Sequence, residues 1–471
     1  MDYGWLSLLP PLIAIILAIK TREVLFSLLF GIYIGWVIVE HWNPIHAASS
    51  TVAVLLKVTR KEGNTEVLAF SFLVGALIAL IQRSGGLEGF VRLVKRRGLV
   101  RGRRSAGILS FLIGVFVFIE SNINALVIGT VSRPIFDRLK IPREKLAYIC
   151  DSTAAPVCIL IPLNAWGAYI IALLANEGVD KPLFFLLRSI PLNFYPLFAL
   201  LILLFVILTG RDIGPMVEAE KRARTTGKLL RDGAVPLISA EVTALSPKEG
   251  VKPRAVNMLL PVVVMLGMMP ISLYITGKGD IMRGAGGLSV LWAVATAVGV
   301  ASLIYFGQRI FNLKEISSLI VKGMRGMMSL VIILALAFGI GETCRTLGTG
   351  VYTASLLSRG LPPFFVPALL FLTACFISFA TGTSWGTFAI LIPIGVPLVS
   401  AIGGNLPLTL AAILGGGVFG DHASPISDTT LVSSMASACD HIDHVRTQLP
   451  YAAIAASIAF ILYLVLGFLF L

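Results

Sequence analysis

The chain has 471 residues, of which 56% are hydrophobic and only 13% charged, and this composition excludes a soluble globular protein. Apolar runs of roughly 17–25 residues predict membrane-spanning helices rather than barrel strands. The excess of Lys and Arg that gives a net charge of +13 lies in short loops between these runs, which indicates positive-inside topology and no nucleic-acid partner. The sequence holds no glycine-rich phosphate loop, so we expect neither an ATP-driven pump nor an enzyme.

The first half begins with three predicted spans and two loops on opposite sides of the membrane. The spans are 5–19, 23–39 and 66–82. We expect the loop 40–65, between the second and third spans, to lie outside. The very basic loop 92–104 (RLVKRRGLVRGRR) follows the third span and is expected inside.

Residues 105–132 lie between that basic loop and a second basic loop at 133–145, and the positive-inside rule puts both loops inside. These 28 residues are too few for two full crossings, because each crossing needs about 20 residues. We therefore predict a re-entrant hairpin that enters and leaves at the same face. Its tip is the polar stretch Glu120-Ser121-Asn122-Ile123-Asn124.

A broken helix is predicted over 146–175, because polar residues and prolines interrupt an apolar run there. These residues are Asp151, Ser152, Thr153, Pro156, Pro162 and Asn164. The span 183–209 then returns to the inside. The polar and basic stretch 211–254 is predicted to be an inside connector with some helical character.

The second half repeats this plan. Its predicted elements are three spans, a hairpin, a broken helix, a polar loop and a last span, at 255–276, 287–306, 326–342, 364–399, 408–438, 439–448 and 450–471. The second hairpin has its polar tip at Thr381–Thr387. The predicted fold class is thus an all-α polytopic membrane protein with an inverted-topology repeat, since the first half starts outside and the second inside. Residues 1–210 and 255–471 are the two repeats, joined by 211–254, and we expect substrate to bind where they meet at the membrane midplane.

The most informative stretch is 415–434, GGGVFGDHASPISDTTLVSS, which has strongly apolar flanks. It holds Asp421, His422 and Asp428 together with several hydroxyl groups. A charge in hydrocarbon costs about 3 kcal/mol even on a lenient scale, so such residues rarely lie there without a function or a partner. The glycines and Pro425 predict that the helix breaks here, and broken helix ends at membrane depth offer carbonyl and amide groups to ions. We therefore predict half of a substrate site in a secondary transporter.

Four segments carry a resemblance to a known family: GDHASPISDTTLVSS, the following CDHIDHVRTQLPYA, REKLAYICDSTAAPV and GPMVEAEKRARTTGK. From about residue 65 onward the chain resembles the NhaC-type sodium/proton antiporters of the ion-transporter superfamily. The resemblance implies a multi-pass Na⁺/H⁺ antiporter of the cytoplasmic (inner) membrane, in contact with lipid and often a homodimer. It implies no cofactor other than the transported Na⁺ and H⁺, and a transport domain that moves against a scaffold.

The family's motif places binding residues in both halves. Carried over to this chain, the motif positions are Asp151, Ser152, Thr153, Pro156, Thr381, Gly382, Thr383, Ser384, Asp421, His422, Ser424, Pro425, Ser427 and Asp428. The first hairpin tip departs from the family, which is expected to carry paired aspartates where this chain has Glu120, Ser121 and Asn122. This tip, with Asn164, favours an alternative: Na⁺- or H⁺-coupled transport of a small organic solute such as an amino acid.

Exchange of Na⁺ for H⁺ requires oxygen ligands for a hard cation and a carboxylate that holds either the ion or a proton. We predict that Na⁺ is bound through Asp151, Asp428, Thr383 and Ser424, with Asp421 and Glu120 as further acids. The simpler alternative is that the aspartates cap broken helices and the hydroxyls bond to their own helix.

The histidines are expected to have supporting positions. His422 is expected to be a hydrogen-bonded helper, and His441 and His444 are expected to lie in a loop at the inner surface. A third hypothesis, an intramembrane hydrolase using Asp421, His422 and Ser424, is disfavoured because the three residues lie in one short segment.

Overall fold

The computed structural model describes residues 3–21, 23–61, 64–96, 102–118, 120–162, 164–236, 247–279, 284–349, 352 and 362–470, and every regular element in these residues is a helix. Within them, six helices are long and apolar enough to cross a membrane, or nine if each of three bent helix pairs counts as one span. The predicted all-α multi-pass class is therefore confirmed. Parts of the predicted basic loop 92–104 and of the connector 211–254 lie outside the described residues.

The first half opens with a bundle of spans. Its helices up to the first hairpin are η1 (Gly4–Leu8), α1 (Leu9–Thr21), α2 (Val24–Val39), α3 (Pro44–Thr59), α4 (Asn64–Arg83) and α5 (Gly86–Arg96). The prediction of a loop over 40–65 was wrong, because α3 occupies most of it. The Asn43 side chain accepts hydrogen bonds from the amides of Ile45 and His46, and Pro44 suits the first helical turn, so the helix has a complete start signal.

The predicted hairpin and broken helix of the first half are both present as helices with short interruptions. The elements are α6 (Arg103–Phe116), α7 (Ser121–Arg138), α8 (Arg143–Ser152), α9 (Ala155–Leu160) and α10 (Ala165–Asn176). They are followed by α11 (Pro182–Ser189), η2 (Ile190–Leu192), α12 (Phe194–Thr209) and α13 (Pro215–Thr226). The segments Arg143–Leu160 and Ala165–Asn176 are bent by 42° to each other, and Pro182–Leu192 is bent by 43° to Phe194–Thr209.

The second half follows the same order. Its helices are α14 (Val256–Thr276), α15 (Gly286–Gly307), α16 (Leu313–Gly326), α17 (Met328–Leu347), η4 (Pro363–Phe365), α19 (Val366–Thr381), α20 (Ser384–Ala401), α21 (Leu406–Ala423), α22 (Asp428–Ser437) and α23 (His441–Leu469). The predicted polar loop 439–448 was wrong, because α23 already begins at His441. The Asp440 side chain caps it by accepting from the amides of Ile442 and Asp443. As a consequence His444 is fully buried instead of lying in a surface loop.

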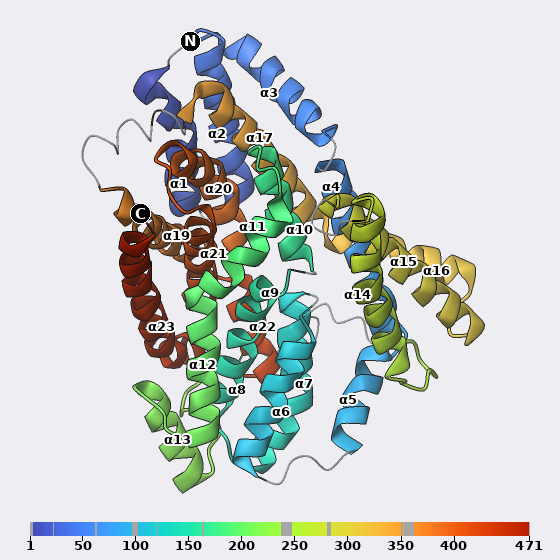
Figure 1. Ribbon diagram of the computed structural model, residues 1–471. Helices are drawn as coiled ribbons and strands as arrows, with labels where there is room; N and C mark the ends of the chain where they lie inside the picture. The colour runs from blue at the N-terminus through green and yellow to red at the C-terminus, as the bar shows by residue number, and fades with distance from the viewer. Residues whose placement is uncertain are drawn as a thin grey trace.

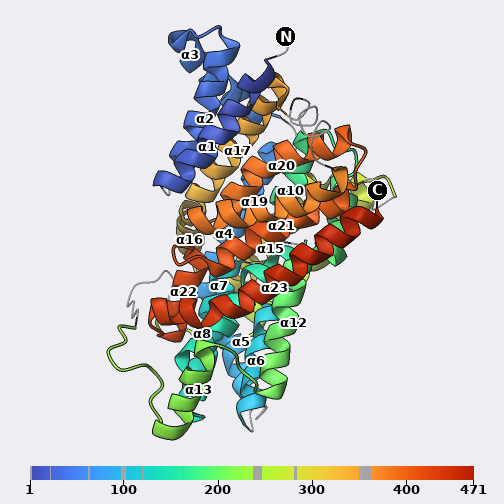
Figure 2. The same ribbon diagram turned by 90° about the vertical axis from the view of Figure 1, so that its left-hand side faces the viewer.

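The third span of each half packs against the first spans of the other half. Helix α4 of the first half packs against α15 and α16 of the second, while α17 of the second half packs against α2 and α3 of the first. Figure 1 shows the two groups at the top and at the right of the molecule. The hairpins and broken helices lie mostly below and to the left of these two groups in Figure 1, and Figure 2 shows α19, α21 and α23 running side by side. The elements with the polar tips therefore form one body that the apolar spans border on two sides.

The glycines of the stretch 415–434 do not break the helix as predicted, because α21 continues through them to Ala423. They let helices approach closely: a Cβ atom at Gly416 would collide with the backbone of Phe371, and one at Gly420 with the backbone of Phe379. Small residues four apart are a common packing face between membrane helices. The break follows the glycines, between α21 and α22, and contains Pro425.

Candidate functional site

The hairpin tips and the second helix break converge on one cavity of about 390 Å³. Its polar wall comes from the first hairpin tip, the second hairpin tip and the broken helix, and comprises Glu120, Ser121, Asn122, Thr381, Thr383, Asp421, Asp428 and Thr429. Two tryptophans from different halves, Trp166 and Trp385, form part of the wall with ring centroids 5.0 Å apart. The far wall belongs to the flanking spans, through Ser71 and Val74 of α4 and Ile333 of α17.

Asp421 lies at the end of α21 and is only 2% exposed. Its carboxylate accepts three hydroxyl hydrogen bonds: from Ser384 to Oδ2 at 2.6 Å, and from Ser427 and Thr429 to Oδ1 at 2.5 and 3.3 Å. Hydrogen bonds to a carboxylate satisfy its charge, and a hydroxyl that donates its proton keeps its oxygen lone pairs free. Asp421 therefore orients three hydroxyl groups, of which that of Thr429 belongs to a residue that lines the cavity.

Asp428 is the first residue of α22, and its side chain is open to the cavity. Oδ1 accepts from the Thr429 amide at 3.0 Å, as a carboxylate at a helix N-terminus does. Oδ2 accepts from the Asn122 side chain at 3.3 Å. Because it has few donors and an open side, Asp428 is the acid of this group that can bind an ion or a proton from the cavity.

The first hairpin tip contributes polar groups to the same wall. The Ser121 hydroxyl donates to Glu120 at 3.3 Å. Asn122 donates to Asp428 through Nδ2, while its buried Oδ1 has no hydrogen-bond donor within the described residues. A buried carbonyl oxygen without a donor is costly unless a cation or water satisfies it. Asn122 thus offers a free oxygen beside Asp428.

Asp151 lies away from this wall, fully buried at the end of α8. Its Oδ2 accepts from Gln448 at 2.7 Å and lies 3.8 Å from Nε2 of His444. In the part of the chain that the structure describes, no hydrogen bond of good geometry reaches Oδ1, although the Thr430 hydroxyl interacts with this carboxyl. Asp151 and Ser424 are not among the described residues that line the cavity, whereas Asp428 and Thr383 are. The binding of one Na⁺ by all four remains a prediction.

His422 is held by two other elements. Its Nε2 pairs with Ser152 at 2.9 Å and its Nδ1 with the Tyr195 hydroxyl at 2.6 Å. The Ser424 hydroxyl donates to the Phe379 carbonyl at 2.7 Å. The nucleophile–base chain required by the hydrolase hypothesis is therefore not formed. His422 joins the two broken helices at their breaks.

The side chains of three further predicted binding residues form hydrogen bonds with backbone groups. Asn164 caps α10 by accepting from the amides of Trp166 and Gly167, and it donates to the Phe118 and Cys158 carbonyls. Thr153 and Thr381 donate to the carbonyls of Ile149 and Ile377 in their own helices. Within the described residues Thr383 makes no side-chain capping bond, and it lines the cavity.

Sequence reasoning missed the residues that hold the site from a distance. Gln448 donates to Asp151 and to the His422 carbonyl, and Asn124 donates to the carbonyls of Gly114 and Thr153. Thr429, which lines the cavity and donates to Asp421, was not among the predicted binding residues. The available signal was that Gln448 and His444 lie four residues apart, on one face of a helix that enters the membrane.

Apolar spans around buried acids at helix interruptions define a membrane transporter. Residues 157–468 match the model of the Na⁺/H⁺ antiporter family, and the chain belongs to that family. The predicted resemblance to the NhaC-type antiporters is thereby confirmed.

The chain is also similar to two further proteins and to one solved structure. An uncharacterised protein of Haemophilus influenzae is 35% identical over 98% of this chain and 91% of its own length. The malate-2H⁺/Na⁺-lactate antiporter of Bacillus subtilis is 33% identical over 39% of this chain and 38% of its own. The crystal structure of the Alcanivorax borkumensis YdaH transporter has a TM-score of 0.58 at 14% identity, covering 90% of this chain and 89% of its own, which shows a shared fold.

Proposed function

We propose that this protein exchanges Na⁺ for H⁺ across the cytoplasmic membrane by alternating access. The observation that carries the proposal is the pair Asp421 and Asp428, which flank one helix break and line one cavity together with Thr429, whose hydroxyl donates to Asp421. Na⁺ prefers such carboxylate, hydroxyl and carbonyl oxygens, as other hard cations do.

In this mechanism Asp428 is the acid that exchanges Na⁺ for a proton, whereas Asp421 keeps the same hydrogen bonds throughout. Asp421 keeps its three hydroxyl donors in both states and so holds the hydroxyl of Thr429, which lines the cavity, in place for the ion. Asp428 holds either Na⁺, together with the free Asn122 oxygen, or a proton. Because one carboxylate cannot hold both at once, Na⁺ entry expels the proton, and this competition is sufficient for coupled exchange.

The position of the cavity supports alternating access. The cavity is lined both by the hairpins and broken helices and by α4 and α17. A rigid-body shift of the central elements against these flanking spans would open the same site to either side of the membrane. The resemblance also predicts a homodimer, which cross-linking in membrane vesicles would test.

The decisive experiment measures luminal pH in proteoliposomes at clamped membrane potential, after a pulse of NaCl or choline chloride. Sodium-specific alkalinisation is expected for the wild-type protein and should disappear in Asp428→Asn. The matched control is Asp232→Asn, because Asp232 is exposed and ion-paired with Lys228 four residues earlier, far from the cavity in sequence. Normal exchange in folded Asp428→Asn would disprove the assignment of this acid.

The size of the cavity favours a second candidate, the coupled transport of a small organic solute. About 10–15 Å³ already admits one water molecule, whereas this cavity of about 390 Å³ falls in the range of small-molecule sites. The name of the B. subtilis relative includes malate and lactate as well as Na⁺ and H⁺. If NaCl alone gives no response, uptake of labelled amino acids and small carboxylates with and without Na⁺ would identify this second activity.

A further inference from the structure

A second cavity, separate from the transport site, lies among the basic ends of α6, α8 and α13. It has a volume of about 260 Å³ and is lined by Arg103, Arg104, Lys145, Glu220 and Arg224 on its polar side. These helix ends form the lower part of the molecule in Figure 1, the side that positive-inside topology assigns to the cytoplasm. The pocket therefore opens at the inner membrane surface.

The pocket carries more positive than negative charge. Glu220 is buried and accepts from Arg103, from Lys145 at 2.9 Å and from Arg224 at 3.2 Å. Lys145 also binds Asp212 at 2.9 Å. Four cationic side chains thus face two carboxylates, which leaves an excess of two positive charges.

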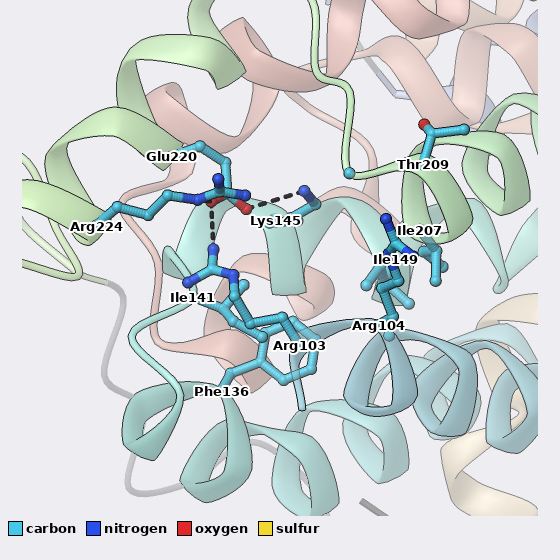
Figure 3. A pocket seen from close by; sticks show the side chains of 12 residues that line it. Arg103, Arg104, Phe136, Ile141, Lys145, Ile149, Ile207, Thr209, Glu220 and Arg224 are labelled. Atoms are coloured by element: carbon cyan, nitrogen blue, oxygen red, sulfur yellow. Dashed lines mark hydrogen bonds and ion pairs between the residues drawn. The ribbon is translucent and has the colours of Figure 1, made fainter. Parts of the chain in front are cut away.

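Arg104 accounts for part of this excess. Within the described residues its side chain makes neither a hydrogen bond nor an ion pair, although the neighbouring Arg103 is fully engaged. Figure 3 shows its guanidinium beside Ile149 and Ile207 and turned away from Glu220. A guanidinium placed against apolar side chains can bind an anion that bears an apolar portion.

The other side of the pocket is apolar and continues into the membrane. Phe136, Ile141 and Ile207 complete the wall, and Thr209 at its edge is the last residue of the apolar helix α12. On the same helix Leu201 and Phe205 are 57% and 54% exposed, as expected for side chains that face lipid tails. The charged end of the pocket therefore lies where phospholipid headgroups lie.

We propose that this pocket binds the phosphate of an anionic membrane phospholipid, with Arg104 on the phosphate and the acyl chains along α12. Basic pockets between membrane helices at the cytoplasmic side are suited to such headgroups, since they combine electrostatic attraction with an apolar rim. The bound lipid would join α6 of the first hairpin to α12 and α13.

The test uses the purified full-length protein in a neutral detergent and measures binding of short-chain phosphatidylglycerol, short-chain phosphatidylcholine and glycerol 3-phosphate. We expect saturable binding of phosphatidylglycerol and much weaker binding of the other two. Arg104→Gln should weaken phosphatidylglycerol binding by about fivefold, the factor expected for one basic residue near a lipid surface. Arg309→Gln, an exposed arginine outside the pocket, is the matched control and should bind as the wild type does.

A second variant distinguishes binding in the pocket from non-specific attraction of the lipid to surface charge. Thr209→Trp keeps every charge but narrows the apolar edge, and tryptophan is well tolerated at a membrane interface. It should also weaken phosphatidylglycerol binding, so the proposal stays testable if Arg104→Gln does not fold. Unchanged binding in either folded variant overturns the proposal. Equal binding of glycerol 3-phosphate would overturn the lipid assignment and indicate a soluble phosphate ligand.

Discussion

Asn122 donates a hydrogen bond to the carboxylate of Asp428 across 3.3 Å, although the two residues are 306 positions apart in the chain. The contact joins the tip of the first hairpin to the break of the second broken helix. Within the described residues it also leaves the asparagine Oδ1 without a hydrogen-bond donor. One side chain thus both orients the exchanging acid and supplies an oxygen beside it.

Asn122→Ala should weaken Na⁺ affinity without unfolding the protein. The variant loses one side-chain hydrogen bond and one oxygen ligand, and a net hydrogen bond is worth about 0.5–1.5 kcal/mol, or about 2- to 13-fold in affinity. The measurement is the Na⁺ concentration for half-maximal exchange. Asn124→Ala is the contrasting variant: it removes the bonds to Gly114 and Thr153 that hold the hairpin, so it should lower thermal stability. Wild-type Na⁺ affinity in Asn122→Ala would remove this residue from the site.

Gln448→Leu should destabilise the protein strongly, because Gln448 is the donor to the buried carboxyl of Asp151 and to the His422 carbonyl. A buried polar group left without its partner costs about 1–3 kcal/mol. The melting temperature in detergent reports the loss. Gln308→Leu makes the same substitution at a half-buried position with one hydrogen bond, to Asn257, and should cost less. Equal melting temperatures for the two variants would contradict the proposed role of Gln448.

Glu177, just beyond the end of α10, should make the stability of the protein depend on pH. Burial raises the pKa of Glu177 from 4.5 to about 7, although the nearby Arg345 pulls it down. Between these two values the folded protein holds a proton that the unfolded chain releases, so stability falls as pH rises toward about 7 and then levels off. The full effect is about 3 kcal/mol at most.

Glu177→Gln removes this titration. The decrease in melting temperature between pH 5 and pH 8 should therefore be smaller in Glu177→Gln than in the wild type. Glu249→Gln, at an exposed glutamate, serves as the control and should leave the decrease unchanged. An identical decrease in Glu177→Gln and the wild type would show that Glu177 does not titrate in this range.

Gly420→Ala should lower stability by overpacking. The added methyl group meets the backbone of Phe379 in α19, which cannot move aside as a side chain can, and overpacking of this kind costs about 1–3 kcal/mol. Gly299→Ala makes the same change in α15, where nothing lies within 4 Å of the new atom. Alanine is the better helix former, so this control should be neutral or more stable by about 1 kcal/mol. Similar melting temperatures for both variants would argue against the close packing of α19 and α21.

Local sequence determined the helices and the position of the breaks. Long apolar runs can satisfy their backbone groups in a membrane only as helices, and Pro425 with its polar neighbours interrupts one of them. The same local signals predicted a break in the stretch that holds Asp421 and Asp428, and the resemblance of this stretch to the NhaC-type antiporters predicted the family. Where a start signal was overlooked, as at Asn43 and Asp440, a loop was predicted in place of α3 and the start of α23.

Tertiary structure decided which of these residues face the cavity. The partners of Asp428, His422 and Asp151 are Asn122, Ser152 and Gln448, which lie 306, 270 and 297 positions away. Neither helix propensity nor spacing along the chain encodes such pairs, because they form only when hairpins and broken helices from both halves pack together. The sequence by itself therefore determined which acids lie at membrane depth, and packing decided that Asp428 opens to the cavity while Asp151 is enclosed behind it.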